Sequence, residues 1–232
     1  ILPIKIFNID IPFLFLLMSS HILSSVFVLL CFLFVINGAN LIDGFNGLLA
    51  INLILINVIL AYININNENL EFAVLLISQI IILLSFLLFN FPNAKIFLGD
   101  SGAYLFGALT SLNTIITNNL NPKISSFFFC TLLFYLFFEV FFSFFRKLKQ
   151  GKSPIYPDDK HLHMLSFYKI SITYGKNTGN FLNSIVINII YLILLTPGLI
   201  FMTNANLSIC WFFILLLIYM VFYFRLYHLT KN

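Results

Sequence analysis

Long uninterrupted apolar runs are the feature that most restricts how this chain can fold. A helix that crosses a bilayer needs about 20 predominantly apolar residues. The sequence offers seven such segments, at roughly 13–36, 48–63, 72–91, 103–118, 124–145, 182–203 and 207–227. With 61% hydrophobic and only 9% charged residues, the chain also lies far outside the composition of soluble domains. We therefore expect an integral membrane protein.

The apolar runs are helical in character. Runs such as FFFCTLLFYLFF are apolar on every face, and the alternation of short strands that marks a membrane β-barrel is absent from the sequence. The sequence predicts an all-α fold, a polytopic membrane bundle of about seven transmembrane helices. No internal repeat or low-complexity linker divides it, so residues 1–232 are interpreted as one membrane domain.

The distribution of cations gives an orientation. Of twelve Lys and Arg, seven fall in the connection 146–176, whereas the stretch NINNENLE carries only acids. Because cytoplasmic loops carry an excess of Lys and Arg, the first connection is expected in the cytosol and the second outside. The cytoplasmic connections would then be 37–47, 92–102 and 146–181, and the outer ones 64–71, 119–123 and 204–206. A bacterial plasma membrane is the expected location.

Three polar clusters share the predicted cytoplasmic side: NGANLIDGFNG (37–47), FPNAKIFLGDSGAY (91–104) and KSPIYPDDKHLHML (152–165). Each has a purely structural interpretation. Asn40 or Asp43 could cap a helix beside turn glycines, and Asp100 suits the start of a helix, where the dipole favours a carboxylate. His161 and His163 could be a solvated pair, and two histidines fall short of the four ligands of a structural zinc site.

Taken together, the clusters favour a phosphate-handling site. Carboxylates such as Asp43 and Asp100 suit Mg²⁺, with Mn²⁺ as the alternative, because these ions take oxygen ligands and bridge substrate phosphates. Histidines and lysines can donate charge-assisted hydrogen bonds to a diphosphate. Glu139 lies about two turns inside the fifth span, where it needs a partner or a water-filled cleft. Its alternative is snorkelling toward Arg146 or Lys147.

The same three clusters, in this order, resemble the signature series of the polyprenyl-phosphate N-acetylhexosamine-1-phosphate transferases. That family includes the enzymes that start O-antigen and teichoic acid synthesis and the phospho-MurNAc-pentapeptide transferases of peptidoglycan. The resemblance implies transfer of a sugar 1-phosphate from a UDP-N-acetylhexosamine to polyprenyl phosphate, with Mg²⁺. The expected partners are these two substrates and membrane lipids, without nucleic acid; a homodimer is left open.

The resemblance also implies residue roles. Asp100 matches the family's magnesium-binding aspartate, and Asn40 and Asp43 match the polar pair of the catalytic cleft, so these three are the catalytic candidates and Asp100 and Asp43 the metal ligands. The expected substrate-binding residues are Asn37, Asn46, Lys160, His161 and His163. Whether an aspartate deprotonates the lipid phosphate or attacks as a nucleophile stays open. The chemistry is mainly positioning and charge neutralisation, which a metal and cationic donors supply.

The chain departs from the family pattern at several positions. Asn46 stands where an aspartate is common, Glu139 where a shorter acid is expected, and Met164 where a further histidine is frequent. These departures favour the O-antigen or capsule type over the peptidoglycan type.

An adjacent aspartate pair of the family is missing upstream of Asn40, and Asp158 and Asp159 in the histidine loop are not that pair. One explanation is a longer natural protein with at least one more helix before Ile1. The other is a catalytically inactive relative that keeps a nucleotide or lipid site. We expect these 232 residues alone to show little or no transferase activity.

Two other classes compete with a transferase. A small-solute transporter would place polar residues near the middle of the bilayer and on both faces, whereas the sequence collects its chemical clusters on one face. A purely structural membrane subunit would leave the three clusters unexplained.

Overall fold

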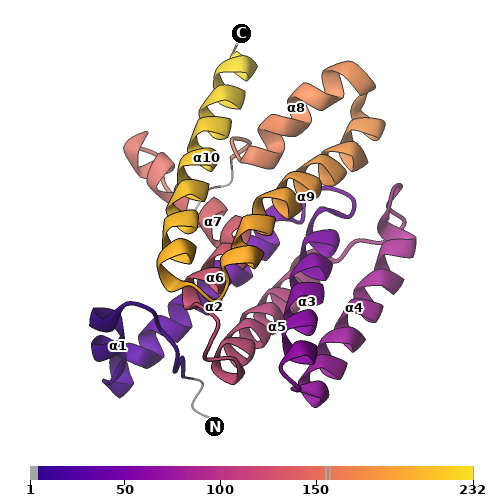
Figure 1. Ribbon diagram of the computed structural model, residues 1–232. Helices are drawn as coiled ribbons and strands as arrows, with labels where there is room; N and C mark the ends of the chain where they lie inside the picture. Colours follow the sequence, from indigo (N-terminus) through magenta and orange to yellow (C-terminus); the bar gives the residue numbers. More distant parts are fainter. Residues whose placement is uncertain (1–4, 155, 157, 232) are drawn as a thin grey trace.

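The computed structural model describes residues 5–154, 156 and 158–231 (Figure 1). Two residues of the cluster 152–165, Ile155 and Pro157, therefore lie outside the described residues.

The described chain is built from helices alone, which confirms the predicted all-α class. The helices are α1 Pro12–Met18, α2 His21–Ile42, α3 Leu48–Asn66, α4 Leu70–Asn90, α5 Gly99–Leu120, α6 Ser126–Leu132, α7 Phe134–Lys149, α8 Leu162–Tyr174, α9 Lys176–Phe201 and α10 Ala205–Lys231. The connections α2–α3 and α4–α5, together with α8, gather toward one end of the bundle, and the connection α3–α4 lies at the other (Figure 1).

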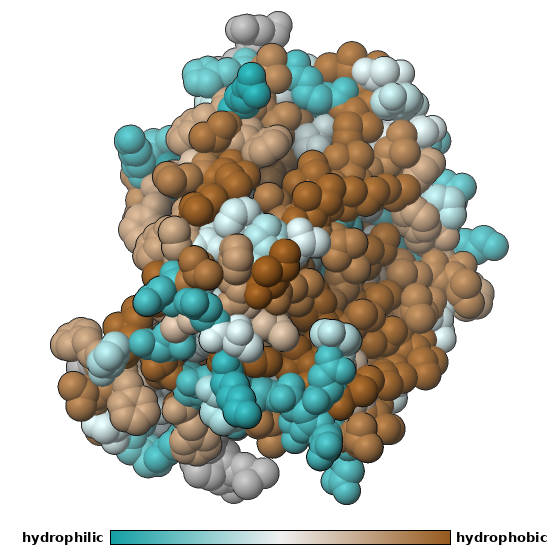
Figure 2. Space-filling model, viewed as in Figure 1, coloured by the Kyte–Doolittle hydropathy of each residue, from teal (hydrophilic) through white to brown (hydrophobic). Residues whose placement is uncertain are grey.

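The helices bear out a multi-pass membrane protein, and the number seven is approximate. Within the described residues, five helices are long and apolar enough to cross a membrane: α2, α3, α4, α9 and α10. Helices α6 and α7 meet at 74° and would together make a sixth span. Helix α5 is long but more polar, and it packs inside the bundle against α2 and α3. Figure 2 shows apolar side chains covering much of one face of the molecule.

The first predicted span is displaced along the chain. The expected span 13–36 and loop 37–47 are wrong in detail, because α2 runs to Ile42 and contains both Asn37 and Asn40. The helix tolerates these amides because Asn37 bonds the carbonyl of Leu33 one turn earlier, at 2.7 Å, and Asn40 finds a partner on another helix. Only 43–47 forms the connection to α3.

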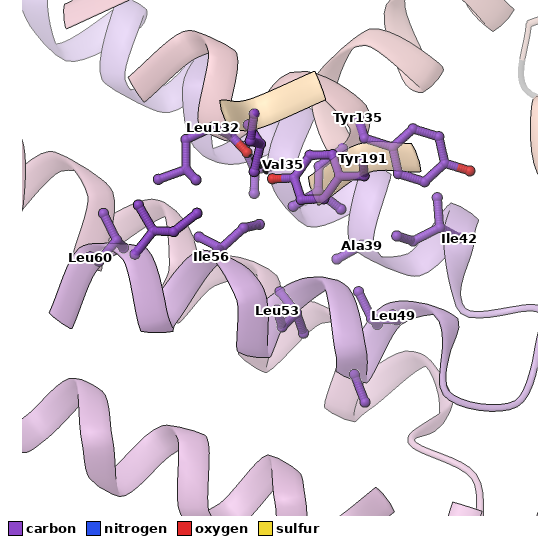
Figure 3. Close-up of a cluster of buried hydrophobic side chains, with 14 of the residues drawn as sticks. Val35, Ala39, Ile42, Leu49, Leu53, Ile56, Leu60, Leu132, Tyr135 and Tyr191 are labelled. Atoms are coloured by element: carbon purple, nitrogen blue, oxygen red, sulfur yellow. Dashed lines mark hydrogen bonds between the residues drawn. The ribbon is translucent and has the colours of Figure 1, made fainter. Parts of the chain in front are cut away.

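The apolar core surrounds α3. In Figure 3, Leu53, Ile56 and Leu60 of α3 lie among apolar side chains contributed by α2, α6, α7 and α9. The hydroxyl of Tyr191 donates to the carbonyl oxygen of Leu132, which ties α9 to the end of α6. Helix α3 is the most buried of the five candidate spans and packs mainly against α4, α5 and α9.

Amide side chains run through the interior. Asn113 donates to Asn57 at 3.2 Å and to Gln79 at 2.7 Å, which joins α5, α3 and α4. Asn52 donates to Asn188 at 3.3 Å. The expectation that polar residues collect on one face is therefore wrong for neutral amides. They bond one another between helices, as polar side chains do in membrane bundles. Because these amides are bonded within the bundle, they add little support for the transporter alternative.

Two glycines bring α2 unusually close to its neighbours. A Cβ at Gly38 would collide with the carbonyl oxygen of Leu136 on α7, and one at Gly107 on α5 would come within 3.0 Å of Ala39 and Ile36. Small residues allow helix backbones to approach closely in membranes. Helix α2 therefore packs closely between α5 and α7.

Candidate active site

The end of α2 and the start of α5 bring two of the predicted catalytic residues into contact. Asn40 Nδ2 donates to Asp100 Oδ1 at 2.8 Å, across sixty positions of sequence. Asp100 lies in the first turn of α5, as predicted, and is exposed. The close approach of α2 and α5 at Gly107 is what places Asn40 beside it.

Asp43 joins this pair from the end of α2. It is the C-cap residue of that helix, where the sequence allowed an N-cap, and it is half-buried. Burial, and next the charge of Asp100, raise the pKa of Asp43 to about 6, while a backbone hydrogen bond from Gly99 acts in the opposite direction. Asp43 and Asp100 are thus two carboxylates close enough to repel each other.

This carboxylate pair is the best place for a divalent cation. No group of three or more His, Cys, Asp and Glu suited to a metal occurs among the described residues. Two neighbouring carboxylates could still hold Mg²⁺, which commonly takes one or two protein carboxylates and fills its other positions with water and substrate phosphate oxygens. The mutual repulsion of Asp43 and Asp100 is the kind that a cation between them relieves.

The connection that carries Asp43 is held by amides. The N–H of Gly47, which has a left-handed φ of +78°, donates to Asn90 Oδ1 at 2.7 Å. The side-chain N–H of Asn46 donates to the carbonyl of Pro92 at 2.8 Å, and its backbone N–H donates to Asn180 Oδ1 at 2.8 Å. The clusters 37–47 and 91–104 are thereby locked together, with α9 as their support.

The histidine cluster lies against the same connection. The ring of His163 packs edge-on against Phe45, with centroids 5.8 Å apart, and its Nδ1 lies 3.3 Å from the hydroxyl of Tyr135. Burial lowers the pKa of His163 to about 4, so the ring is neutral near pH 7. The solvated-pair interpretation is wrong, because His163 and His161 are both buried.

His161 is bonded to Glu139 inside the protein. Its Nδ1 lies 3.1 Å from Glu139 Oε1, and the glutamate is only 1% exposed. Glu139 therefore does not snorkel toward Arg146 or Lys147, because the buried histidine offers it a nearer partner. Arg146 instead pairs with Asp158, at 2.7 Å.

Two further predicted substrate-binding residues have local partners. The side chain of Asn37 is exposed and bonds within its own helix. The ammonium of Lys160 lies 5.7 Å from the ring centre of Tyr227 on α10, and its backbone carbonyl accepts from Tyr223. The substrate-binding roles of Asn37, Asn46, Lys160, His161 and His163 remain predictions.

Residues 1–118, half of the chain, match the model of glycosyl transferase family 4. The chain belongs to this family. It is 33% identical over 146 residues to an undecaprenyl-phosphate alpha-N-acetylglucosaminyl 1-phosphate transferase of Thermotoga maritima, a match that covers 62% of this chain and 44% of the relative.

Phospho-N-acetylmuramoyl-pentapeptide-transferases also match this family 4 chain. That of Leuconostoc mesenteroides is 36% identical over 80 residues, 34% of this chain and 25% of the relative. That of Clostridium perfringens is 31% identical over 109 residues, 47% of this chain and 34% of the relative. The matches thus span less than half the length of these relatives. No solved structure matches the chain.

The family 4 chain also uses residues that the sequence did not single out. Asn180 and Asn183 of α9 hold the two halves of the site, because Asn183 Nδ2 donates to the carbonyl of His163 at 2.9 Å while Asn180 accepts from Asn46. Tyr219 of α10 donates to Glu139 at 2.6 Å. The stretch KNTGNFLNS places several asparagines at the start of an apolar span, and this pattern could have pointed to Asn180 and Asn183. The sequence around Tyr219 has no such pattern.

Proposed function

We propose that this protein transfers an N-acetylhexosamine 1-phosphate from a UDP-sugar to polyprenyl phosphate, giving polyprenyl diphosphate sugar and UMP. The reaction would be the first membrane step of O-antigen, capsule or teichoic acid synthesis. Family membership supports the proposal, as do relatives named for transfer to undecaprenyl phosphate and for transfer of a phospho-N-acetylmuramoyl-pentapeptide.

The observation that carries the proposal is the carboxylate pair at one end of an apolar bundle. Asp43 lies close enough to Asp100 for the charge of Asp100 to raise the pKa of Asp43, and Asn40 fixes Asp100 by a direct hydrogen bond. Anionic oxygens gathered this way repel a phosphate unless a cation lies between, so the arrangement suits a metal diphosphate. Mg²⁺, when bound, would neutralise charge on the transferred phosphoryl group.

The transfer itself needs one bond formed and one broken. An oxygen of the lipid phosphate attacks the phosphorus that carries the sugar, and the bridging oxygen leaves with UMP. Asn40 would keep Asp100 aimed at the cation site, and Asp43 would supply the second carboxylate. The neutral ring of His163 packs on Phe45, two residues after Asp43, and would support the connection that carries Asp43.

The arrangement in the membrane follows from the charge distribution. The cation-rich segment 146–176 runs from the last turn of α7 through α8 to the start of α9, and α8 lies toward the end of the bundle that carries the three clusters (Figure 1). Lys and Arg are retained on the cytoplasmic side, so we place this end in the cytosol of a bacterial cell, where UDP-sugars are found.

The test uses the full-length protein in its membrane, supplied with radiolabelled UDP-N-acetylhexosamine and polyprenyl phosphate. We expect Asp100→Asn and Asp43→Asn each to lower lipid-linked product by at least ~100-fold, the scale of losing one charge-stabilising group. Asp159→Asn, an exposed acid in the histidine loop, is the matched control and should retain activity. Near-normal transfer by either site variant, with normal insertion, would refute the placement.

A further inference from the structure

Both ring nitrogens of His161 face carboxylates of the protein itself. Nδ1 lies 3.1 Å from Glu139 Oε1, and Nε2 lies 3.3 Å from Asp158 Oδ1. An ionised carboxylate only accepts hydrogen bonds, so the Nδ1 that bonds Glu139 presents an N–H. With both nitrogens turned to carboxylates, the ring has no nitrogen left to offer a substrate.

Glu139 is held from three sides. Besides His161, its Oε1 accepts from the backbone N–H of Leu162 at 3.0 Å, which satisfies the first residue of α8, and its Oε2 accepts from the hydroxyl of Tyr219 at 2.6 Å. A buried carboxylate is tolerated only when paired and hydrogen-bonded. Glu139 therefore joins α7, α8 and α10 at one point.

Asp158 is fixed in a similar way from the loop. Arg146 binds it in a two-pronged fashion, at 2.7 and 3.0 Å, the geometry of strong guanidinium–carboxylate pairs. Although burial raises the pKa of Asp158, the hydrogen bond and charge of Arg146 hold that pKa below its ordinary value. Arg146 and Glu139 are seven residues apart on α7, hence on the same face of the helix. This face of α7 therefore contacts the loop at two points, Asp158 and His161.

We infer that His161 is a positioning residue, clamped between Glu139 and Asp158, which orients His163 toward the Asp43 connection. The inference rests on the proposed function for its kinetic consequence. His163 follows two residues later, stacks on His161 with centroids 5.6 Å apart and planes 5° apart, and meets Phe45 edge-on with centroids 5.8 Å apart. The clamp thus links α7 and α10 to the carboxylate pair through two stacked imidazoles.

The kinetic test is a double-mutant cycle in the full-length protein with Glu139→Gln, His161→Asn and the combination. If the residues act as one unit, each single variant should lower kcat about 10- to 100-fold, and the double variant should be no worse than the poorer single one. Glu139→Asp keeps the charge and should keep most of the activity. Multiplying defects, with a raised KM for the UDP-sugar in His161→Asn alone, would overturn the inference.

A second readout needs no activity. Lys149 at the end of α7 and Lys152 in the loop that follows are exposed, so limited trypsin cleavage in detergent measures the opening of this loop. We expect Glu139→Gln and Asp158→Asn to accelerate cleavage about fivefold or more, and Glu71→Gln, an acid in the first turn of α4, to leave it unchanged. Asp158 is only half-buried, so its variant should fold even if Glu139→Gln does not.

The two arms separate the clamp from the proposed function. Absence of transfer in the wild-type protein, with faster cleavage in the clamp variants, would refute the function and support the clamp. Transfer by the wild-type protein, with cleavage unchanged in both clamp variants, would refute the clamp alone.

Discussion

The molecule contains two pairs of acids in very different surroundings. Glu139 and Asp158 meet donors supplied by the protein itself: a tyrosine, a backbone N–H, an arginine and His161. Asp43 and Asp100 lie within electrostatic reach of each other, where Asn40 donates to Asp100 and the backbone of Gly99 donates to Asp43.

The difference separates structure from chemistry. A carboxylate whose charge is balanced within the fold stabilises the folded protein and has little reason to bind anything else. A carboxylate pair held together against its own repulsion stores unfavourable electrostatic energy, which a cation can relieve. The direction in which each pKa moves expresses this contrast, because the pKa of Asp158 is lowered and that of Asp43 is raised.

The comparison predicts opposite effects of the same chemical change. Glu139→Gln removes the negative charge from a buried partner of His161 and should lower the free energy of unfolding by about 3 kcal/mol. Asp43→Asn removes a charge that is disfavoured by burial and next by the charge of Asp100, and it should raise stability without divalent cations, by about 1 kcal/mol after allowance for solvent screening. Thermal unfolding in lipid nanodiscs with a chelator measures both.

The pH dependence supplies the control for Asp43→Asn. The folded protein raises this pKa from 3.8 to about 6, so ionised Asp43 is disfavoured in the fold. The destabilisation is absent below pH 3.8, grows as the pH rises, and is complete above about 6. The gain from Asp43→Asn should therefore appear at pH 7 and vanish near pH 4. A gain that is the same at both pH values would contradict the raised pKa of Asp43.

The sequence predicted the parts of this contrast that depend on composition and order. The apolar runs specified a helical membrane bundle, and the charge distribution grouped the three polar clusters at one end. The resemblance to a transferase family singled out Asn40, Asp43 and Asp100, which the fold brings together.

The sequence could not supply the pairings that depend on helix packing. From the sequence, Glu139 could reach Arg146 about two turns further along α7. In the structure the loop folds back, so that Arg146 pairs with Asp158 and Glu139 with His161. The contribution of Tyr219, eighty residues from Glu139, depends on how α10 packs, which no local pattern encodes. The sequence predicted the end of α2 too early. Asn37 and Asn40 are typical of a loop as long as their hydrogen-bond partners within the bundle are unknown.

A packing change should disturb both pairs at once. Gly38 lies where α2, which carries Asn40, meets α7 one turn before Glu139, and an added methyl group would strike the backbone of Leu136. We expect Gly38→Ala to destabilise the protein by about 2 kcal/mol, typical of overpacking, and to lower transfer. Gly44→Ala, where nothing lies within 4 Å, is the matched control. Equal melting temperatures for the two variants would show that α2 and α7 can separate freely.

The smallest expected effect tests the carboxylate pair most directly. If Asp43 and Asp100 share a cation, millimolar Mg²⁺ should raise the melting temperature of the wild-type protein by about 2–4 °C, the change that ~1 kcal/mol produces in a chain of this size. Asp43→Asn starts from a higher melting temperature in chelator and should gain much less from Mg²⁺, because its repulsion is already gone. Glu139→Asp should respond to Mg²⁺ like the wild type, since that carboxylate is engaged with His161 and Tyr219. An equal Mg²⁺ response in Asp43→Asn and wild type would move the cation away from this pair and leave the raised pKa of Asp43 to burial.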